Sequence, residues 1–239
     1  MSQLALVRHG QATLFADTYD QLSPLGEEQA RRLGVYWVEQ GAVFDAVYCG
    51  TLRRQTRTLE IVAGVYAEAG RSWPAPVTTP NLNEYDGDGI MQHILPPLRE
   101  RDARLRGLAD TAERHADGPE RYRHYQRLFE AVTGAWVQGT VTADAVESWQ
   151  AFYDRVSQMW RRILRDEGRG RRVAAFTSGG PIAVAVQMAV RAPEAVALEL
   201  NWRIRNGALT ELVFSGDRVS LDTFNTVPHL PDPALWTYR

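Results

Sequence analysis

Leu4-Ala5-Leu6-Val7-Arg8-His9-Gly10 is the stretch that decides the fold of this 239-residue chain. Its first four residues are all apolar, which predicts a short buried β-strand, and the glycine after His9 predicts a turn. Ligands of open α/β sheets bind at the carboxyl ends of the strands. Because Arg8 and His9 stand at such an end, we expect a binding or catalytic site there.

A strand-helix-strand-helix order follows from this start. Ser23 and Pro24 are typical of an N-cap and a first helical residue, and they predict a helix over about 24–40. A second strand is expected over 44–49 and a second helix over about 51–69. This alternation predicts an α/β fold, a three-layer sandwich with a mostly parallel central sheet.

Strand patterns return near the end of the chain. A buried strand is expected over 172–177, and the glycines and proline after it predict an apolar helix over about 179–190. Two further strands are expected over 208–214 and 218–224, joined by the turn Ser215-Gly216-Asp217.

Residues from about 87 to 167 have a different pattern, rich in Arg and Glu with helical spacing. Amphipathic helices are expected over 99–115 and 121–136. Strand patterns lie on both sides, so we interpret this segment as a helical insertion in a single domain of residues 1–239. Its large aromatic residues could line a site, but packing in a helical core is favoured. They are Trp136, Trp149, Tyr153 and Trp160.

The composition excludes several kinds of chemistry. All 27 basic residues are arginine, because the chain contains no lysine. A Schiff-base lysine and a Walker A lysine are therefore excluded. Any bound anion must be held by arginine, histidine, hydroxyl or backbone N–H groups, and we attribute most of the arginines to codon bias.

Charge and cysteine content limit the partners and the compartment. The net charge of −2 argues against a nucleic-acid partner or a membrane surface. The single cysteine, Cys49, is compatible with a reducing cytoplasm, where we expect the protein. The N-terminus has no signal-peptide pattern, and no apolar stretch approaches the roughly 18 residues of a membrane span.

Arginines gather where the second helix is expected to begin. Arg53, Arg54 and Arg57 lie at or near this N-terminus, where the helix dipole disfavours cations. A bound anion would explain their position, since helix N-termini bind phosphate. A solvent-facing turn would equally explain Arg53 or Arg57.

Three carboxylates lie in the glycine-rich loop of residues 83–89. They belong to Glu84, Asp86 and Asp88. One of them could act as a general acid if it lies near a cationic site. A solvated acidic loop is the alternative, and the ligand spacing of an EF-hand is absent.

Taken together, these features resemble the histidine phosphatase superfamily, which has the phosphoglycerate-mutase-like fold. The resemblance rests on Arg8-His9-Gly10 combined with Leu52, Arg54 and Thr58 in a Leu-x-Arg-x-x-x-Thr pattern. It covers the strands and helices of the sheet but not the insertion.

The resemblance implies a role for each matching residue. His9 would be the nucleophile that forms a phosphohistidine, and Arg8 and Arg54 would bind the phosphoryl oxygens. Glu84 would protonate the leaving alcohol and then activate water. The implied activity is a metal-independent hydrolysis of small phosphate monoesters without a cofactor. No metal-ligand spacing of His or Cys is evident.

One position departs from the family pattern. Ser178 stands where the family has its second catalytic histidine, and a hydroxyl carries no charge. Losing one such donor costs about 10²–10³ in rate. Backbone N–H groups of Gly179 and Gly180 could still face an anion. His229 or His93 could replace the missing histidine, although a structural role is favoured for both.

Two other functions remain open at this point. Ser178 is compatible with a phospholigand-binding module that has reduced or lost turnover. A phosphoglycerate-mutase-type phosphotransferase would need further cations near the site. The candidates lie in the insertion, where their helical spacing also fits a solvated face. They are Arg99, Arg101, Arg104 and Arg106.

Overall fold

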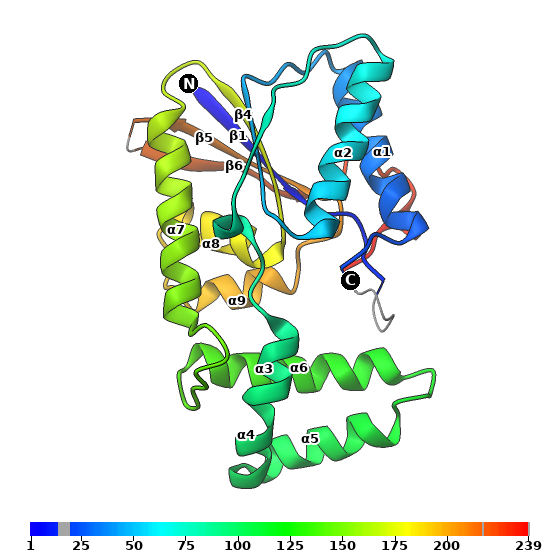
Figure 1. Cartoon of the computed structure of the whole chain (residues 1–239), viewed down its shortest axis with the longest axis vertical. Coiled ribbons are helices and arrows are strands. Elements are labelled where there is room, and N and C mark those ends of the chain that lie inside the picture. Colours follow the sequence, from blue (N-terminus) through cyan, green and yellow to red (C-terminus); the bar gives the residue numbers. More distant parts are fainter. Residues whose placement is uncertain (14–19, 217, 239) are drawn as a thin grey trace. The chain divides into compact units, whose positions relative to one another are not determined.

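The structure is a computed structural model that describes residues 1–13, 20–216 and 218–238. It contains two compact units (Figure 1). The sheet unit comprises Met1–Glu84 and Val156–Arg239, and the helical unit comprises Tyr85–Arg155. The predicted turn residue Asp217 lies outside the described residues. No helix in the described ranges is both long enough and apolar enough to span a membrane.

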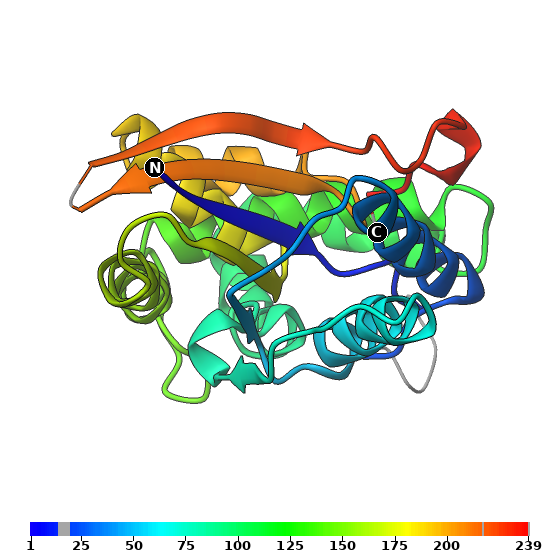
Figure 2. The same cartoon turned by 90° about the horizontal axis from the view of Figure 1, so that it is seen from above.

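The sheet unit has a six-stranded mixed sheet in the order β3-β2-β4-β1-β5-β6 (Figure 2). The three pairings from β3 to β1 are parallel, whereas β5 and β6 are antiparallel to their neighbours. This confirms the expected α/β class with a mostly parallel sheet. The strands are β1 (Ser2–Arg8), β2 (Ala46–Cys49), β3 (Pro76–Thr78), β4 (Arg172–Thr177), β5 (Leu209–Ser215) and β6 (Arg218–Thr226).

Helices cover the two faces of this sheet, because the strand residues are apolar on both. Ala5 and Val7 of β1 pack in one core cluster with Trp37 and Tyr66, which come from α1 and α2. Leu4 alternates with them and is also fully buried. Helix α8 contacts β1 and β6. The helices are α1 (Pro24–Glu39), α2 (Arg53–Glu68), α8 (Gly179–Val190) and α9 (Val196–Asn201).

The register of the parallel strands brings three strand ends to one edge. The backbone N–H of His9 donates to Thr177 O over 3.0 Å, and Gly50 N donates to Phe176 O over 3.1 Å. The segments that follow β1, β2 and β4 therefore start side by side. This is the edge where the sequence predicted a site.

Gly10 is required by the packing of the turn after β1. A Cβ atom on Gly10 would lie 2.2 Å from the carbonyl oxygen of Gly26 in the first turn of α1. Only glycine permits this approach. Ser23 caps the same helix, since its hydroxyl accepts from Gly26 N over 3.1 Å, as the sequence predicted.

One of the two helices predicted for the helical unit is broken in the structure. The helix expected over 99–115 is divided at Asp102, whose side chain accepts from the backbone N–H groups of Arg104 and Leu105. Asp102 thus starts a new helix, an N-cap role for which aspartate is well suited. The unit contains α3 (Gly87–His93), α4 (Leu95–Arg101), α5 (Ala103–Arg114), α6 (Arg121–Val137) and the first half of α7 (Trp149–Asp166).

The large aromatic residues of the insertion pack in hydrophobic cores, as the sequence predicted, but these cores belong to two different units. Trp136 and Trp149 pack edge to face in the helical unit, with ring centroids 5.6 Å apart. Trp160 lies in the second half of α7, in the sheet unit, and its indole N–H donates to Pro181 O over 2.9 Å. All three side chains are buried.

Several short elements were not predicted. Strand β3 is three residues long and begins with a proline, which a sheet tolerates at its edge. The second strand begins at Ala46 rather than at Phe44. The other elements without a predicted range are the helices α3, α7 and α9 and two 3₁₀ helices, η1 (Pro80–Leu82) and η2 (Pro233–Leu235).

Candidate active site

His9 follows the last residue of β1, and its imidazole is buried with only 6% of the residue exposed. Its Nδ1 lies 2.7 Å from Gly10 O, an acceptor, so this nitrogen carries the proton. Its Nε2 then has the lone pair, and it accepts a hydrogen bond from Arg54 Nε over 3.2 Å. The ring is therefore fixed with its nucleophilic nitrogen beside a guanidinium.

The surroundings keep this imidazole neutral. Burial and the nearby cations Arg54 and Arg8 hold the pKa of His9 well below its ordinary value, although the hydrogen bond to Gly10 opposes the shift. A lowered pKa means that His9 stays unprotonated at a pH where a free histidine would already be largely charged. Neutral imidazole is the form that can attack an electrophile.

Arg54 reaches His9 from the first turn of α2, and an acidic side chain holds it there. Asp20 Oδ1 lies 2.7 Å from Arg54 Nη1, and Asp20 Oδ2 accepts from the backbone N–H of Arg53 over 2.8 Å. Asp20 thus supplies an anion at this helix N-terminus, the position where the sequence predicted a bound one. Sequence reasoning missed Asp20, because it lies far from Arg54 along the chain.

Thr58 explains the spacing of the Leu-x-Arg-x-x-x-Thr pattern. It lies one turn after Arg54, where its hydroxyl donates to Arg54 O over 2.7 Å and accepts from Gly10 N over 3.1 Å. A single buried hydroxyl therefore joins α2 to the turn after β1. This contact fixes the helix that carries Arg54 relative to His9.

Ser178 lies at the end of β4, fully buried and in contact with a second polar side chain. Gln55 Nε2 donates to Ser178 Oγ over 2.8 Å and to Leu82 O over 3.2 Å. Gln55 thus fills the space beside the hydroxyl. No local pattern indicates this partner, because Gln55 is one of many polar residues in α2.

Glu84 and Arg8 occupy the same edge of the sheet unit. Glu84 Oε2 accepts from Gly180 N over 2.9 Å at the start of α8, two residues after Ser178. The guanidinium of Arg8 donates through Nη1 to Ile204 O. The structure therefore places His9 in contact with Arg54. Glu84 and Ser178 both lie at the junction of β4 and α8.

A comparison with known proteins establishes the family of this chain. Residues 4–137 and 86–227 match the family described as the histidine phosphatase superfamily (branch 1). The chain belongs to this superfamily. Its strand-end histidine and the arginine of α2 are therefore found in a fold whose relatives include phosphatases and phosphoglycerate mutases.

The relatives in this superfamily differ in their named activities. Over 90 residues, 35% of each chain, the protein is 40% identical to a 2,3-bisphosphoglycerate-dependent phosphoglycerate mutase of Thermobifida fusca (strain YX). Over 69 residues it is 39% identical to the 2,3-bisphosphoglycerate-dependent phosphoglycerate mutase 1 of Nitrosomonas europaea. The match thus spans about a third of the length of these relatives.

Solved structures of the superfamily share the fold along nearly the whole chain. The α-ribazole phosphatase of Shigella flexneri superposes with a TM-score of 0.59 at 18% identity, covering 94% of this chain and 96% of that one. A mycobacterial glucosyl-3-phosphoglycerate phosphatase, in complex with VO3, gives 0.59 at 21% identity, covering 94% and 99%. Identities this low establish the fold alone.

His229 belongs to the sheet unit and His93 to the helical unit. His229 is buried beside Gly207 and lies 6.4 Å from the Tyr36 ring, centroid to centroid. Within the described ranges, neither of its ring nitrogens has a hydrogen-bond partner. His93 belongs to α3 of the helical unit.

Because His229 is buried, we expect it to lower the free energy of unfolding at acidic pH. Burial, and secondarily Arg32, lower its pKa from 6.5 to about 4. Below pH 6.5 His229 is protonated in the unfolded chain but stays neutral in the folded protein. The free energy of unfolding therefore falls as the pH falls towards 4. Between pH 7 and pH 5 we expect this group to cost about 2 kcal/mol. Urea unfolding should show a pH dependence smaller by that amount in His229→Leu, and an equal dependence would contradict the prediction.

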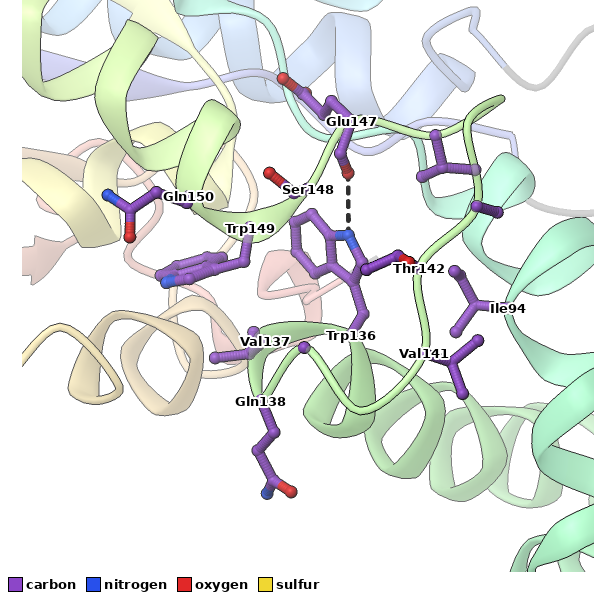
Figure 3. A pocket seen from close by; sticks show the side chains of 13 residues that line it. Ile94, Trp136, Val137, Gln138, Val141, Thr142, Glu147, Ser148, Trp149 and Gln150 are labelled. Atoms are coloured by element: carbon purple, nitrogen blue, oxygen red, sulfur yellow. Dashed lines mark hydrogen bonds between the residues drawn. The ribbon is translucent and has the colours of Figure 1, made fainter.

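The helical unit has an apolar pocket of about 180 Å³ (Figure 3). Trp136 and Trp149 frame it, and the Trp136 indole N–H donates to Glu147 O over 2.9 Å. Its lining comes entirely from the helical unit and includes none of the predicted catalytic residues. The pocket is therefore not the candidate active site.

Proposed function

We propose that this protein is a metal-independent phosphatase that hydrolyses small phosphate monoesters through a phosphohistidine at His9. The observation that carries the proposal is the buried, neutral His9 whose Nε2 faces Arg54. A nucleophile next to a guanidinium is suited to an anionic phosphoryl group, because the cation offsets charge at the oxygens as the nitrogen attacks.

In the first step, the Nε2 lone pair forms an N–P bond while the P–O bond to the alcohol breaks. Arg54 and Arg8 would bind the phosphoryl oxygens. The alkoxide leaving group takes a proton from the carboxyl of Glu84, and the alcohol departs. Gly10 O keeps the proton on Nδ1, which supports the cationic phosphohistidine.

In the second step, a water oxygen attacks phosphorus and the N–P bond breaks. Glu84, now a carboxylate, accepts the proton of the water, and the electron pair of the bond returns to Nε2. Phosphate leaves, and the imidazole and the protonated Glu84 are regenerated. The position of Glu84 beside Gly180 at the same sheet edge supports this assignment.

The proposal is tested first at Glu84. We expect Glu84→Gln to lower kcat for p-nitrophenyl phosphate in EDTA by about 10²–10⁴, because an amide cannot transfer the proton. Asp88→Asn is the matched control, since Asp88 is an exposed carboxylate four residues later, in the first turn of α3. Equal rates for both variants would remove Glu84 from the mechanism, and an inactive wild type across a panel of phosphate esters would contradict the phosphatase.

A second candidate function is a phospholigand-binding module with little turnover. It is favoured by the uncharged Ser178, which the resemblance in sequence aligns with the family's second histidine, and by Gln55, which occupies the adjacent space. Such a module would bind phosphate through Arg54 without releasing product. Its test is calorimetry with inorganic phosphate alongside the esterase panel.

The contact between Gln55 and Ser178 determines how a histidine at position 178 should affect stability and turnover. Because Gln55 fills the space beside the hydroxyl, Ser178→His alone overpacks the site, a change that costs about 1–3 kcal/mol of stability. The double variant Gln55→Ala, Ser178→His opens that space. We expect it to gain about 10²-fold in kcat over Gln55→Ala, since it adds one donor to the phosphate site. No gain in a folded double variant would show that Ser178 does not limit turnover.

A mutase is the third candidate, and the matching segment of the Thermobifida fusca enzyme favours it. Two of the four candidate cations, Arg99 and Arg106, have partners within the helical unit. Arg99 pairs with Asp110 and Glu113 on the helical unit, and Arg106 donates to the carbonyl oxygens of residues 99 and 100. Phosphoryl exchange between 2- and 3-phosphoglycerate, without net phosphate release, would support the mutase over the phosphatase.

A further inference from the structure

We propose that His115, Glu120 and His124 of the helical unit bind a divalent transition metal ion of the Zn²⁺ class. One ligand atom of each side chain lies within 4.8 Å of the others. Two imidazoles and a carboxylate are a donor set that zinc accepts, with water completing a tetrahedral site. None of these residues belongs to the proposed phosphatase mechanism.

The connection between two helices creates this cluster. His115 directly follows the last residue of α5, and Glu120 directly precedes the first residue of α6. His124 lies four residues after Glu120, so both side chains lie on one face of the first turn of α6. The His115 and His124 rings approach to 4.2 Å between centroids with a tilt of 32°.

The hydrogen bond of His115 leaves the lone pair of its other ring nitrogen available to bind a metal. Its Nδ1 lies 2.9 Å from Thr111 O, so Nδ1 carries the proton and Nε2 carries the lone pair. Metal-binding histidines commonly donate their other ring N–H to a carbonyl or carboxylate in this way. The contact with Thr111 therefore fixes the ring in a tautomer that can bind a metal.

The other two groups are oriented in a compatible way. His124 Nε2 is shielded from solvent and, within the described ranges, has no hydrogen-bond partner. It lies 3.5 Å from Glu120 Oε2, about the separation of two ligand atoms on one tetrahedral ion with bonds of about 2.1 Å. Glu120 Oε1 is held by Arg123 Nη1 over 3.0 Å, which leaves Oε2 directed at His124.

The donor set selects the class of metal. Imidazole nitrogens suit zinc, copper and nickel, whereas Mg²⁺ prefers oxygen ligands in an octahedral arrangement. An ion here would join the end of α5 to the start of α6 and so brace the hairpin. The spacing of histidine and cysteine does not indicate this site, because its third ligand is a glutamate.

The test is calorimetric titration of the full-length, tag-free protein with Zn²⁺ and separately with Mg²⁺. We expect one Zn²⁺ per chain, and binding weakened at least about tenfold in Glu120→Ala and in His124→Ala. His93→Ala is the matched control and should bind Zn²⁺ as the wild type does. Glu120 is exposed, so Glu120→Ala should fold, and circular dichroism checks both variants.

Zinc-edge X-ray absorption gives a second, independent measurement on the wild type. Two imidazole rings and oxygen donors in the first shell would support the site. Unchanged Zn²⁺ affinity in both variants, loss of binding in His93→Ala, or equally tight Mg²⁺ binding would overturn the proposal. Hydrolysis of p-nitrophenyl phosphate by Glu120→Ala should equal that of the wild type, so failure here is distinguishable from failure of the proposed phosphatase.

Discussion

His9→Ala is expected to lower p-nitrophenyl phosphate hydrolysis by about 10⁴-fold or more, because loss of a covalent nucleophile removes the whole two-step route. The measurement is steady-state phosphate release in EDTA. A second readout is intact mass after rapid alkaline denaturation, which should detect one added phosphoryl group on the wild type and none on the variant.

His124→Ala is the control for this experiment, since it removes a histidine of α6 that has no role in the proposed phosphatase mechanism. It should retain wild-type rate and phosphorylation. The phosphohistidine mechanism would be wrong if His9→Ala, shown to be folded, released phosphate at a rate comparable to the wild type. It would equally be wrong if a phosphoryl group were found on another residue during turnover.

Arg54→Ala is expected to have the second largest effect. It removes the cation that contacts His9 Nε2, so we expect kcat/KM to fall by about 10²–10³ and calorimetric binding of inorganic phosphate to be lost. Arg54→Lys should recover part of the binding only, because an ammonium retains the charge but not the planar fork.

Arg53→Ala is the matched control, because Arg53 neighbours Arg54 on α2 but is exposed. It should leave kcat/KM within about twofold of the wild type, as surface substitutions usually do. If Arg53→Ala and Arg54→Ala had equal effects, general electrostatic attraction would replace specific binding by Arg54.

The elements that are predictable from the sequence are those set by a local pattern or by the end of a strand. Residues 172–177 and 179–190 have the predicted bounds, because a buried apolar run is followed by glycines and a proline that begin a helix. The convergence of His9 and Arg54 followed from one rule, that parallel strands present their carboxyl ends at a common edge.

The missed features depend on contacts between distant segments. Asp20 reaches the start of α2 from a loop before α1, and Gln55 meets Ser178 from another helix. Neither residue type is unusual in its local sequence. The break at Asp102 was missed for a different reason, since helical periodicity continues on both sides of a good N-cap residue.

The pairing of Asp20 with Arg54 has a consequence for the entropy of anion binding. An exposed arginine samples many rotamers, and a ligand that binds it must restrict them. Asp20 and His9 already hold this side chain in one orientation. The rotational freedom of Arg54 is therefore lost when the chain folds, and an incoming anion meets a guanidinium that is ordered before it arrives.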